Sequence, residues 1–434
     1  STDSRTLPAG ALFVALRGER FDAHDFVPQA LQAGAVAALV ERPLATVERD
    51  RLLVVDDTLR ALGALAAWAR RRCPMRVVAI TGSNGKTTTK EMVAAICTAA
   101  YAPHGKVLKT EGNLNNLIGL PLTLLRADGD EVVGVLEMGM NQPGEIARMA
   151  EIARPDVAVV TNVGRAHLEG LGSLAGVAAA KGELYAGLPN ESVIAVNLDD
   201  EWVRRIAAPF PGRRVTFGSG GDVQAAAVRD RGVDGIDFDL VVAGERVPVH
   251  LAHVGVHNVA NALAAAAVAH ALGIAPGAIA AGLARPPAAA MRMQVHELAN
   301  GVTVINDAYN ANPESTVAAL RAVRLLQRRC VAVLGDMREL GDGSGGAHRE
   351  VGACAAALGF DELVAVGEHG ADVRAGALAA GMDAARIHVC ASPAAAADAV
   401  RAGWRAGDVV LVKGSRGMRM EEAVRALEAA GGPD

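Results

Sequence analysis

The chain has 434 residues, 51% of them hydrophobic and 21% charged, and its formal net charge is -5. This composition excludes a disordered protein, and the length allows roughly two to four packed domains. Because the 43 basic and 48 acidic residues are interspersed, no long basic run is present, and we expect neither nucleic-acid binding nor membrane insertion. The five cysteines are scattered without a CxxC pair, which predicts reduced thiols in a cytosolic protein.

The N-terminal part of the chain alternates strand-like and helix-like segments. Residues 11–18 and 35–42 are strand-like, whereas residues 26–34 and 58–72 have the spacing of helices. This alternation predicts a small α/β domain over residues 1–72. No stretch has the basic, apolar and small-residue order of a secretion signal, so we expect a cytoplasmic protein.

Short β-branched runs then alternate with alanine- and leucine-rich stretches, which is typical of βαβ units on a parallel sheet. The expected buried strands of this central domain, residues 73–298, are 76–81, 132–138, 156–163 and 192–197. Residues 213–254 alternate apolar and polar side chains, which predicts antiparallel strands. Polar residues and a proline interrupt the apolar stretch 259–284, which predicts two buried helices and no membrane span.

A second series of buried strands predicts another doubly wound domain over residues 299–434. These strands are expected at residues 302–307, 330–337, 362–367, 386–390 and 408–415. The fold class is therefore α/β, in three domains: a small N-terminal one, a central one with a mainly parallel sheet and a C-terminal Rossmann-like one. We expect the protein to be a monomer.

Polar or glycine-rich residues follow each strand of the central domain. In an open parallel sheet, ligands bind beyond the carboxyl ends of the strands. We therefore expect four segments to converge on one crevice: Gly82 to Lys86, Glu137, Asn162 to His167, and Asn197.

The first of these segments has the order of a phosphate-binding loop. Gly82, Gly85, Lys86 and Thr87 stand in G-x-x-G-K-T order between a predicted strand and a predicted helix. In such a loop, the glycines let backbone N–H groups face the anion, the lysine reaches the terminal phosphates and the hydroxyl binds magnesium. Ile80 occupies the place of the first glycine of the usual pattern. The flanking strand and helix favour nucleotide binding over a chance glycine turn.

Three further side chains are candidates for a metal site, and each has a plainer alternative. Glu137 ends an apolar strand and either binds magnesium together with Thr87 or is a solvated strand-end acid. His167 follows another strand and is either a metal ligand or a structural hydrogen-bonding residue. Lys181 lies among alanines, where it either extends to solvent or loses its proton and becomes a nucleophile, including toward carbon dioxide.

Polar residues of two later segments also indicate ligand contacts. His257 and Asn261 share one face of a predicted helix, with Asn258 beside them, although asparagines also cap and pack helices. Asp307 at a strand end and Arg292 in the preceding linker are candidates for phosphate or metal chemistry.

Two groups of loop residues are candidates for substrate binding. Asn113, Asn115 and Asn116 crowd one loop, for which simple turn formation is the alternative. The charged and polar residues that follow two C-terminal strands suit a zwitterionic ligand, with solvated loops as the alternative. They are Asp336, Glu339, Lys413, Ser415 and Arg416.

Nine segments, in this order, resemble the Mur ligase family across nearly the whole chain. They are TGSNGKTTTKEM, TEGNLNNLIGLPLTLL, LEMGMNQPGEI, TNVGRAHLEGLGS, AKGELY, GVHNVANALAA, NDAYNANPES, LGDMRELG and VKGSRGMRME. The N-terminal segment DSRTLPAGALFVALRGERFDAHDF also resembles a uridine-nucleotide domain of this family. Single motifs of this kind are weak, whereas nine in order are highly specific.

The resemblance implies use of ATP with magnesium, and two magnesium ions are expected. A substrate carboxylate takes the γ-phosphoryl group and becomes an acyl phosphate, from which an incoming amine displaces phosphate through a tetrahedral intermediate. The versions DAYNANP and GDMRELG imply a UDP-N-acetylmuramoyl tripeptide and D-alanyl-D-alanine as substrates, in the synthesis of peptidoglycan precursors.

The resemblance also implies catalytic roles for individual residues. Lys86 would hold the β- and γ-phosphates, Thr87 and Glu137 one magnesium ion, and His167 with carbamylated Lys181 the second. The other expected ATP-binding residues are Gly82, Ser83, Asn84, Gly85, Thr88, Asn258, Asn261, Arg292, Asp307, Tyr309 and Asn310. The expected substrate-binding residues are Ser4, Arg5, Asp22, His24 and Phe26 for the uridine nucleotide, Thr110, Asn113, Asn115 and Asn116 for the muramoyl peptide, and Asp336, Glu339, Lys413 and Arg416 for the dipeptide.

Two positions depart from the family pattern. Ala23 replaces an expected glycine, which weakens the uridine assignment, and residues 341–348 are more glycine-rich than the usual acidic stretch, which predicts a mobile loop.

Two alternative functions also stay open: a sister amide ligase that adds a single amino acid, and a nucleotide-gated module that hydrolyses ATP without ligation. NDAYNANP argues against the first, because an arginine-containing motif is expected there. The grouping of Glu137, His167 and Lys181 for two metals argues against the second.

Overall fold

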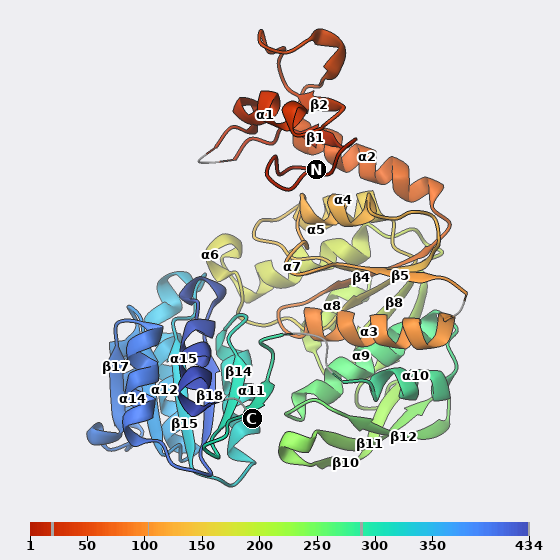
Figure 1. Cartoon of the computed structure of the whole chain (residues 1–434). Coiled ribbons are helices and arrows are strands. Elements are labelled where there is room, and N and C mark those ends of the chain that lie inside the picture. Colours follow the sequence, from red (N-terminus) through yellow and green to blue (C-terminus); the bar gives the residue numbers. More distant parts are fainter. Residues whose placement is uncertain (19–20, 103, 287–289, 433–434) are drawn as a thin grey trace.

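The computed structural model of the chain describes residues 1–18, 21–102, 104–286 and 290–432, and these residues form three α/β units (Figure 1). Each unit has its own sheet, of 3, 9 and 6 strands along the chain, and most neighbouring strands are parallel. In Figure 1 the middle unit lies between the N-terminal unit above it and the C-terminal unit to its left. The α/β fold class and its three-part organisation are therefore confirmed.

The N-terminal unit is a small parallel sheet in the order β1-β2-β3. Its strands are β1 (Leu12–Val14), β2 (Ala37–Val40) and β3 (Leu52–Val54), and α1 (Val27–Gln32) precedes β2. Asp57 caps the N-terminus of helix α2 (Thr58–Arg72), because its side chain accepts a hydrogen bond from the Arg60 N–H at 2.8 Å. This helix packs against α4 (Gly119–Leu124) and α5 (Glu145–Ala153) of the middle unit, so it joins the two units.

The nine-stranded sheet of the middle unit has the order β12-β11-β10-β9-β8-β7-β4-β6-β5. Its parallel strands are β4 (Arg76–Thr81), β5 (Lys106–Lys109), β6 (Glu131–Glu137), β7 (Val157–Val160), β8 (Val193–Asn197) and β9 (Arg213–Phe217). The strands β10 (Val223–Asp230), β11 (Ile236–Val242) and β12 (Glu245–Leu251) pair antiparallel, as predicted. The prediction is wrong for β9, which pairs parallel with β8 because the helix α8 (Glu201–Ala207) crosses between them.

Helices cover both faces of this sheet, which explains why its interior strand β4 is apolar from Val77 to Ile80. Val78 and Ile80 of β4 face one core cluster, and Val77 and Ala79 face the other. The helices on the first face are α3 (Lys86–Tyr101), α9 (His257–Ala271) and α10 (Pro276–Leu283). Those on the second face include α4 (Gly119–Leu124), α5 (Glu145–Ala153), α7 (Leu174–Ala186) and α8.

The apolar segment 259–284 forms α9 and α10, as predicted. Gly282 of α10 lies against the backbone of Ile96 in α3, where an added Cβ would come within 2.4 Å of the Ile96 Cα. Small side chains therefore let these helices approach closely. No helix in the described part of the chain is long and apolar enough to cross a membrane.

The C-terminal unit has a six-stranded sheet in the order β13-β14-β18-β15-β16-β17. Its parallel strands are β14 (Thr303–Asp307), β15 (Cys330–Gly335), β16 (Glu362–Val366), β17 (Ile387–Cys390) and β18 (Val409–Lys413). The edge strand β13 (Gln294–Glu297) is antiparallel to β14. The boundary expected at residue 299 stays a prediction, although β13 precedes it and already belongs to this sheet.

Helices lie on both faces of the C-terminal sheet as well. One core cluster contains residues of α11 (Pro313–Arg324), α12 (Ser344–Ala357) and α13 (Gly370–Ala379), and the other contains residues of α14 (Pro393–Gly403) and α15 (Glu421–Gly431). Residues 341–348, expected as a mobile loop, form the 3-10 turn η4 (Gly341–Gly343) and the start of α12. The buried His348 anchors this start, because its Nε2 accepts the Met337 N–H at 2.8 Å.

The buried hydroxyl of Tyr185 ties α7 to two strands of the middle sheet. It accepts a hydrogen bond from the Val160 N–H at 2.9 Å and donates one to the Ala195 carbonyl oxygen at 2.8 Å. Tyr185→Phe should lower the free energy of unfolding by about 1–3 kcal/mol, because both backbone groups would stay buried without a partner. Urea denaturation measures this loss. Tyr101→Phe is the control and should change stability little, since its hydroxyl has no hydrogen-bond partner within the described ranges.

Candidate active site

The loop between β4 and α3 approaches two side chains so closely that only glycine fits. Gly82 has φ 150°, and an added Cβ would lie 1.8 Å from the Thr161 hydroxyl oxygen. Gly85 has φ 80°, and an added Cβ would lie 2.0 Å from the Asn261 amide oxygen. Both glycines are therefore required by close contacts, and Gly85 also precedes the first residue of α3. The N-terminus of α3 is thus available to an anion.

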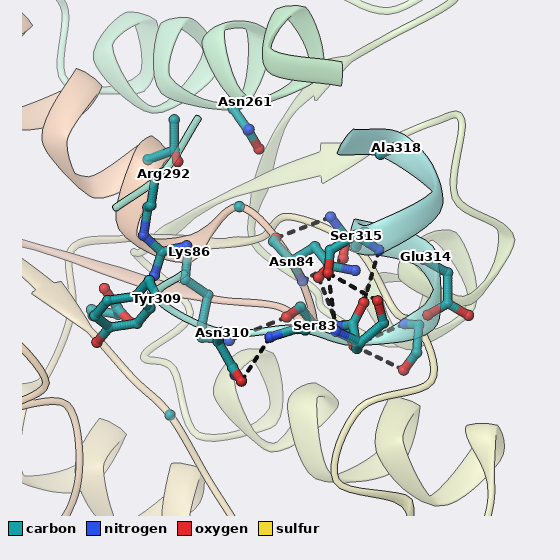
Figure 2. Close-up of a pocket in the computed structure, with 18 of the residues that line it drawn as sticks. Ser83, Asn84, Lys86, Asn261, Arg292, Tyr309, Asn310, Glu314, Ser315 and Ala318 are labelled. Carbon is teal, nitrogen blue, oxygen red and sulfur yellow. Dashed lines mark hydrogen bonds between the residues drawn. The ribbon is translucent and has the colours of Figure 1, made fainter. Parts of the chain in front are cut away.

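A cavity of about 780 Å³ opens beyond this loop. Its walls include segments that follow β4, β6, β7 and β8, so the predicted convergence of strand ends is confirmed. The C-terminal unit supplies a further part of the wall, as Figure 2 shows for Tyr309, Asn310 and Glu314. The cavity lies where strand order reverses around β4, whose neighbours β6 and β7 both follow it in the chain.

Lys86 and Glu137 line the cavity, and Thr87 lies behind them in contact with Glu137. The Lys86 Nζ donates to the Gly82 carbonyl oxygen at 2.6 Å, and burial lowers the pKa of this lysine, while Glu137 nearby opposes the shift. The Thr87 hydroxyl donates to Glu137 at 2.8 Å and accepts from the Arg292 guanidinium at 2.7 Å. The second carboxylate oxygen of Glu137 accepts from the Asn115 amide at 2.8 Å. The Glu137 carboxylate is therefore buried, and a hydrogen bond to each of its two oxygens fixes its orientation.

His167 and Lys181 lie on the segments after β7. His167 has a left-handed backbone with φ 57°, and its Nδ1 lies 2.6 Å from a carboxylate oxygen of Glu339 in the C-terminal unit. The Nδ1 atom has no hydrogen-bond partner among the described residues, so the contact is a close approach of the imidazole to the carboxylate. Lys181 is 1% exposed, and burial, followed by the nearby Lys86 charge, lowers its pKa well below the ordinary value. A neutral amine is thus favoured at this position.

The residues expected to hold ATP come together, with two pairings that the sequence does not indicate. Asn261 donates to the Asn258 amide oxygen at 2.9 Å on α9. Asp307 pairs with Lys413 at 2.6 Å, so these two residues neutralise each other across β14 and β18. The guanidinium of Arg292 stacks on the Tyr309 ring at 4.2 Å, and Figure 2 shows both beside Lys86.

Family models match three consecutive parts of the chain. The Mur ligase family catalytic domain matches residues 1–70, the Mur ligase middle domain residues 80–269, and the Mur ligase glutamate ligase domain residues 291–416. The chain belongs to the Mur ligase family.

Individual members of this family resemble the chain along nearly its whole length. The UDP-N-acetylmuramoyl-tripeptide–D-alanyl-D-alanine ligase of Escherichia coli is 42% identical, over 99% of this chain and 94% of that protein. The crystal structure of MurF from Acinetobacter baumannii superposes with a TM-score of 0.90 at 36% identity, covering 99% of this chain and 93% of that one. MurF from Thermotoga maritima in complex with ADP has a TM-score of 0.86 at 30% identity, covering 99% and 96%.

Several substrate-binding residues expected from the Mur ligase resemblance lie away from the cavity. Ser4, Arg5, Asp22, His24 and Phe26 belong to the N-terminal unit, where Arg5 pairs with Asp3 at 2.7 Å and His24 with Asp22 at 2.5 Å. Of the peptide residues, Asn113, Asn115 and Asn116 line the cavity. Of the dipeptide residues, Glu339, Lys413 and Arg416 line it.

Two expected residues instead support the walls of this Mur ligase site. The Thr110 hydroxyl accepts the Glu137 backbone N–H at 2.9 Å, and the buried Lys90 donates to the Thr110 carbonyl oxygen at 2.7 Å. The Asp336 carboxylate accepts the backbone N–H groups of Glu368 and His369 at 2.9 and 3.0 Å. Direct ligand contact by Thr110 and Asp336 stays a prediction.

The cavity-wall residues that sequence reasoning missed include Glu91, Asp199, Asp200 and His253. Asp199 and Asp200 follow the strand β8, so the rule that selected Asn197 could have found them. Glu91 and His253 had no such signal. Glu91 lies within the helix α3, and His253 follows the antiparallel strand β12, so neither residue follows a parallel strand. No cluster of three or more His, Cys, Asp or Glu side chains suited to a metal occurs among the residues described.

Proposed function

We propose that the chain catalyses the ATP-dependent ligation of D-alanyl-D-alanine to a UDP-N-acetylmuramoyl tripeptide, which forms a pentapeptide precursor of peptidoglycan. One observation carries the proposal: the phosphate loop and charged residues of the C-terminal unit line a single cavity, in a chain 42% identical to an enzyme of that name. ATP binding is supported by the ADP complex of the Thermotoga relative. A cytoplasmic site of action and a monomeric state belong to the proposal.

The proposed reaction has two steps. A carboxylate oxygen of the tripeptide attacks the γ-phosphorus, the bond to the β,γ-bridging oxygen breaks, and ADP leaves. The amine of the dipeptide then attacks the acyl carbon, loses a proton, and expels phosphate from the tetrahedral intermediate. Both steps move negative charge onto phosphate oxygens. The backbone N–H groups at the start of α3 and the Lys86 ammonium would stabilise that charge.

The oxygen donors of the site fit magnesium. This ion does not require a cluster of several protein ligands. Magnesium commonly binds one or two protein oxygens together with substrate phosphates and water. Thr87 and Glu137 would hold one ion in this way, with Glu137 already oriented by Asn115. His167 and a carbamylated Lys181 would hold a second. Magnesium would supply positive charge near the phosphates.

The carbamate on Lys181 fits the observed surroundings of that side chain. Its amine is buried, its pKa is lowered first by burial and then by Lys86, and it has no hydrogen-bond partner in the parts of the chain that the structure describes. A neutral amine can add to carbon dioxide, with its proton released to solvent. The resulting anion would be favoured by the same Lys86 charge that disfavours the ammonium form.

The charged residues of the C-terminal unit suit a zwitterionic dipeptide. Lys413 and Arg416 are cationic and would attract its carboxylate, whereas Glu339 is anionic and would attract its amine. Both cations already have an acidic partner, Asp307 for Lys413 at 2.6 Å and Glu421 for Arg416 at 2.8 Å. Arg416 is the stronger candidate for the carboxylate because its side chain is 57% exposed, whereas that of Lys413 is 4% exposed. The N-terminal residues Ser4, Arg5, Asp22, His24 and Phe26 are proposed for the uridine nucleotide.

Release of ADP tests the proposed function. We expect release that requires both the UDP-muramoyl tripeptide and D-alanyl-D-alanine, with little release when single amino acids replace the dipeptide. Release with a single amino acid would favour a sister amide ligase. Release without either substrate would favour the ATP-hydrolysing module. Tripeptides that end in diaminopimelate or in lysine are compared in the same assay, because the cavity residues do not select between them.

A further inference from the structure

The loop that follows β7 supports the phosphate loop from one side. The Asn162 side chain accepts the Asn84 N–H at 2.9 Å and donates to the Asn84 carbonyl oxygen at 3.0 Å. The Ser83 hydroxyl accepts the Gly164 N–H at 2.8 Å and donates to the Gly164 carbonyl oxygen at 3.0 Å. His167 ends the same loop. The position of this loop therefore sets the positions of both the phosphate loop and His167.

Arg165, at the centre of this loop, reaches across to two helices of the C-terminal unit. Its Nε donates to the Glu314 carboxylate in the first turn of α11 at 2.6 Å. Its two terminal nitrogens donate to the two carboxylate oxygens of Glu350 on α12 at 2.8 and 2.9 Å. One guanidinium thus binds two acidic side chains that lie 149 and 185 residues away in the sequence. We call these three side chains the Arg165 clamp.

The geometry of the Arg165 clamp distinguishes it from an ordinary surface ion pair. Isolated exposed ion pairs contribute little to stability. Arg165 instead binds one carboxylate with two parallel hydrogen bonds and a second carboxylate beside it, and such bidentate networks contribute more. The pairing raises the pKa of Arg165, chiefly through Glu350, and lowers the pKa of Glu350. The three side chains are 39%, 38% and 48% exposed, so salt will screen their attraction.

Other polar contacts cross the same boundary, but their residues belong to the cavity. Asn312, which caps α11, donates to the Asn84 amide oxygen of the phosphate loop at 2.8 Å. Glu339 lies 2.6 Å from His167. Arg165 and Glu350 differ from these residues because neither lines the cavity. A change in the Arg165 clamp can therefore alter the docking of the two units while the predicted ligand contacts stay in place.

We propose that Arg165 is a positioning residue that holds the C-terminal unit docked against the phosphate loop through Glu314 and Glu350. The inference rests on the proposed function, because the acyl phosphate and the dipeptide amine are assigned to the cavity between these two units. A cation that is paired only in the docked arrangement shifts the population toward that arrangement. It would thereby shorten the time during which the acyl phosphate is exposed to water.

Arg165→Ala should lower kcat about three- to tenfold and leave KM for ATP within about twofold. We expect KM for ATP to change less than kcat because the phosphate loop and Lys86 lie within the middle unit, although Tyr309 and Asn310 of the C-terminal unit also line the cavity. Arg165→Lys should lie between the wild type and the alanine variant, since lysine keeps the charge but lacks the planar fork. Steady-state ADP release with both substrates measures these values. An unchanged kcat in Arg165→Ala would overturn the proposal while leaving the proposed function intact.

A charge swap separates clamping from general structural damage. Arg165→Glu and Glu350→Arg should each lower kcat more than Arg165→Ala does, because each brings like charges together. The double variant should recover part of the kcat lost by the worse single variant, since the pair between positions 165 and 350 is restored in reverse while Glu314 stays beside a like charge. A double variant no better than the worse single variant would contradict the Arg165 clamp. Glu350→Gln, an exposed and mild change on α12, supplies a second test if the reversals fold poorly.

Salt dependence gives a readout that a purely structural role would not move. Potassium chloride should lower the kcat of the wild type more steeply than that of Arg165→Ala, because only the wild type has the pair to screen. Arg401→Ala is the matched control, since it breaks an exposed pair with Asp398 within the single helix α14. The control should keep the wild-type kcat and salt profile. Equal salt slopes in wild type and Arg165→Ala would overturn the proposal.

Discussion

Replacing Lys181 with alanine should lower ligase activity by at least about 100-fold, and formate or acetate should restore part of it. The side chain is 1% exposed on α7 and faces the charge of Lys86. If it carries a carbamate, the variant loses an anionic oxygen ligand, and the space left by the side chain admits a small carboxylate. Steady-state ADP release with both substrates, with and without added carboxylate, measures the effect.

The matched control for this change is Lys106→Ala. Lys106 is exposed, pairs with Asp128 at 2.7 Å and lies at the start of β5, so its loss should leave activity unchanged and insensitive to carboxylates. Labelled bicarbonate gives a readout that does not depend on activity: a carbamate carbon signal should appear in the wild type and be absent from Lys181→Ala. Full activity in Lys181→Ala would contradict the carbamate.

The lowered pKa of Lys181 also predicts a pH-dependent difference in stability. Between the lowered pKa in the folded protein and the ordinary value of 10.5, the unfolded chain binds more protons at this group than the folded one does. The free energy of unfolding contributed by Lys181 therefore rises with pH across that range. In buffer free of carbon dioxide, Lys181→Met should be more stable than wild type near neutral pH, and the difference should shrink as pH rises. A constant difference would show that burial does not perturb this lysine.

The buried strands of the nine-stranded and six-stranded sheets were predictable because helices cover both faces of each sheet. A strand covered on both sides is apolar along its buried length, as from Val77 to Ile80 of β4, and such a run is visible in the sequence without any knowledge of its partners. The three strands that the sequence analysis missed are β3, β5 and β13, and each lies at the edge of its sheet. Edge strands pair on one side only and tolerate polar side chains, so KVLK and QVHE carry no such signal.

The same contrast applies to the site. The end of a buried strand marks where a ligand can bind, which is why the phosphate loop, Glu137 and Asn197 were found from the sequence. The pairing of Asp307 with Lys413 was not predicted, because 106 residues separate them and only the adjacent strands β14 and β18 bring them together. The pairing of Arg165 with Glu314 and Glu350 was not predicted for the same reason. Charge pairs between segments that are distant in the sequence depend on the fold and leave no local pattern.

Glu137→Gln should reduce kcat by about 100- to 1,000-fold while the fold persists. The glutamine keeps the volume of the buried side chain, and its amide oxygen can still accept a hydrogen bond from the Thr87 hydroxyl. The Asn115 amide, which donates to Glu137 in the wild type, would have to turn its oxygen toward the new NH2 group. The glutamine lacks the negative charge with which Glu137 is proposed to bind magnesium. The magnesium concentration required for half-maximal rate should therefore rise as well, because a neutral amide is a weaker ligand for a hard cation. Titration of activity with magnesium measures both changes.

Glu131→Gln is the control, because it makes the same chemical change on the same strand. Glu131 begins β6 and Glu137 ends it, and both carboxylates are buried. Glu131 accepts the backbone N–H groups of Asp128 and Gly129 at 3.2 and 3.0 Å, so its replacement should lower stability without changing the magnesium requirement. If both variants lost activity to the same extent, the loss would reflect damage to β6. If Glu137→Gln kept the wild-type magnesium dependence, Glu137 would orient Thr87 without binding the metal.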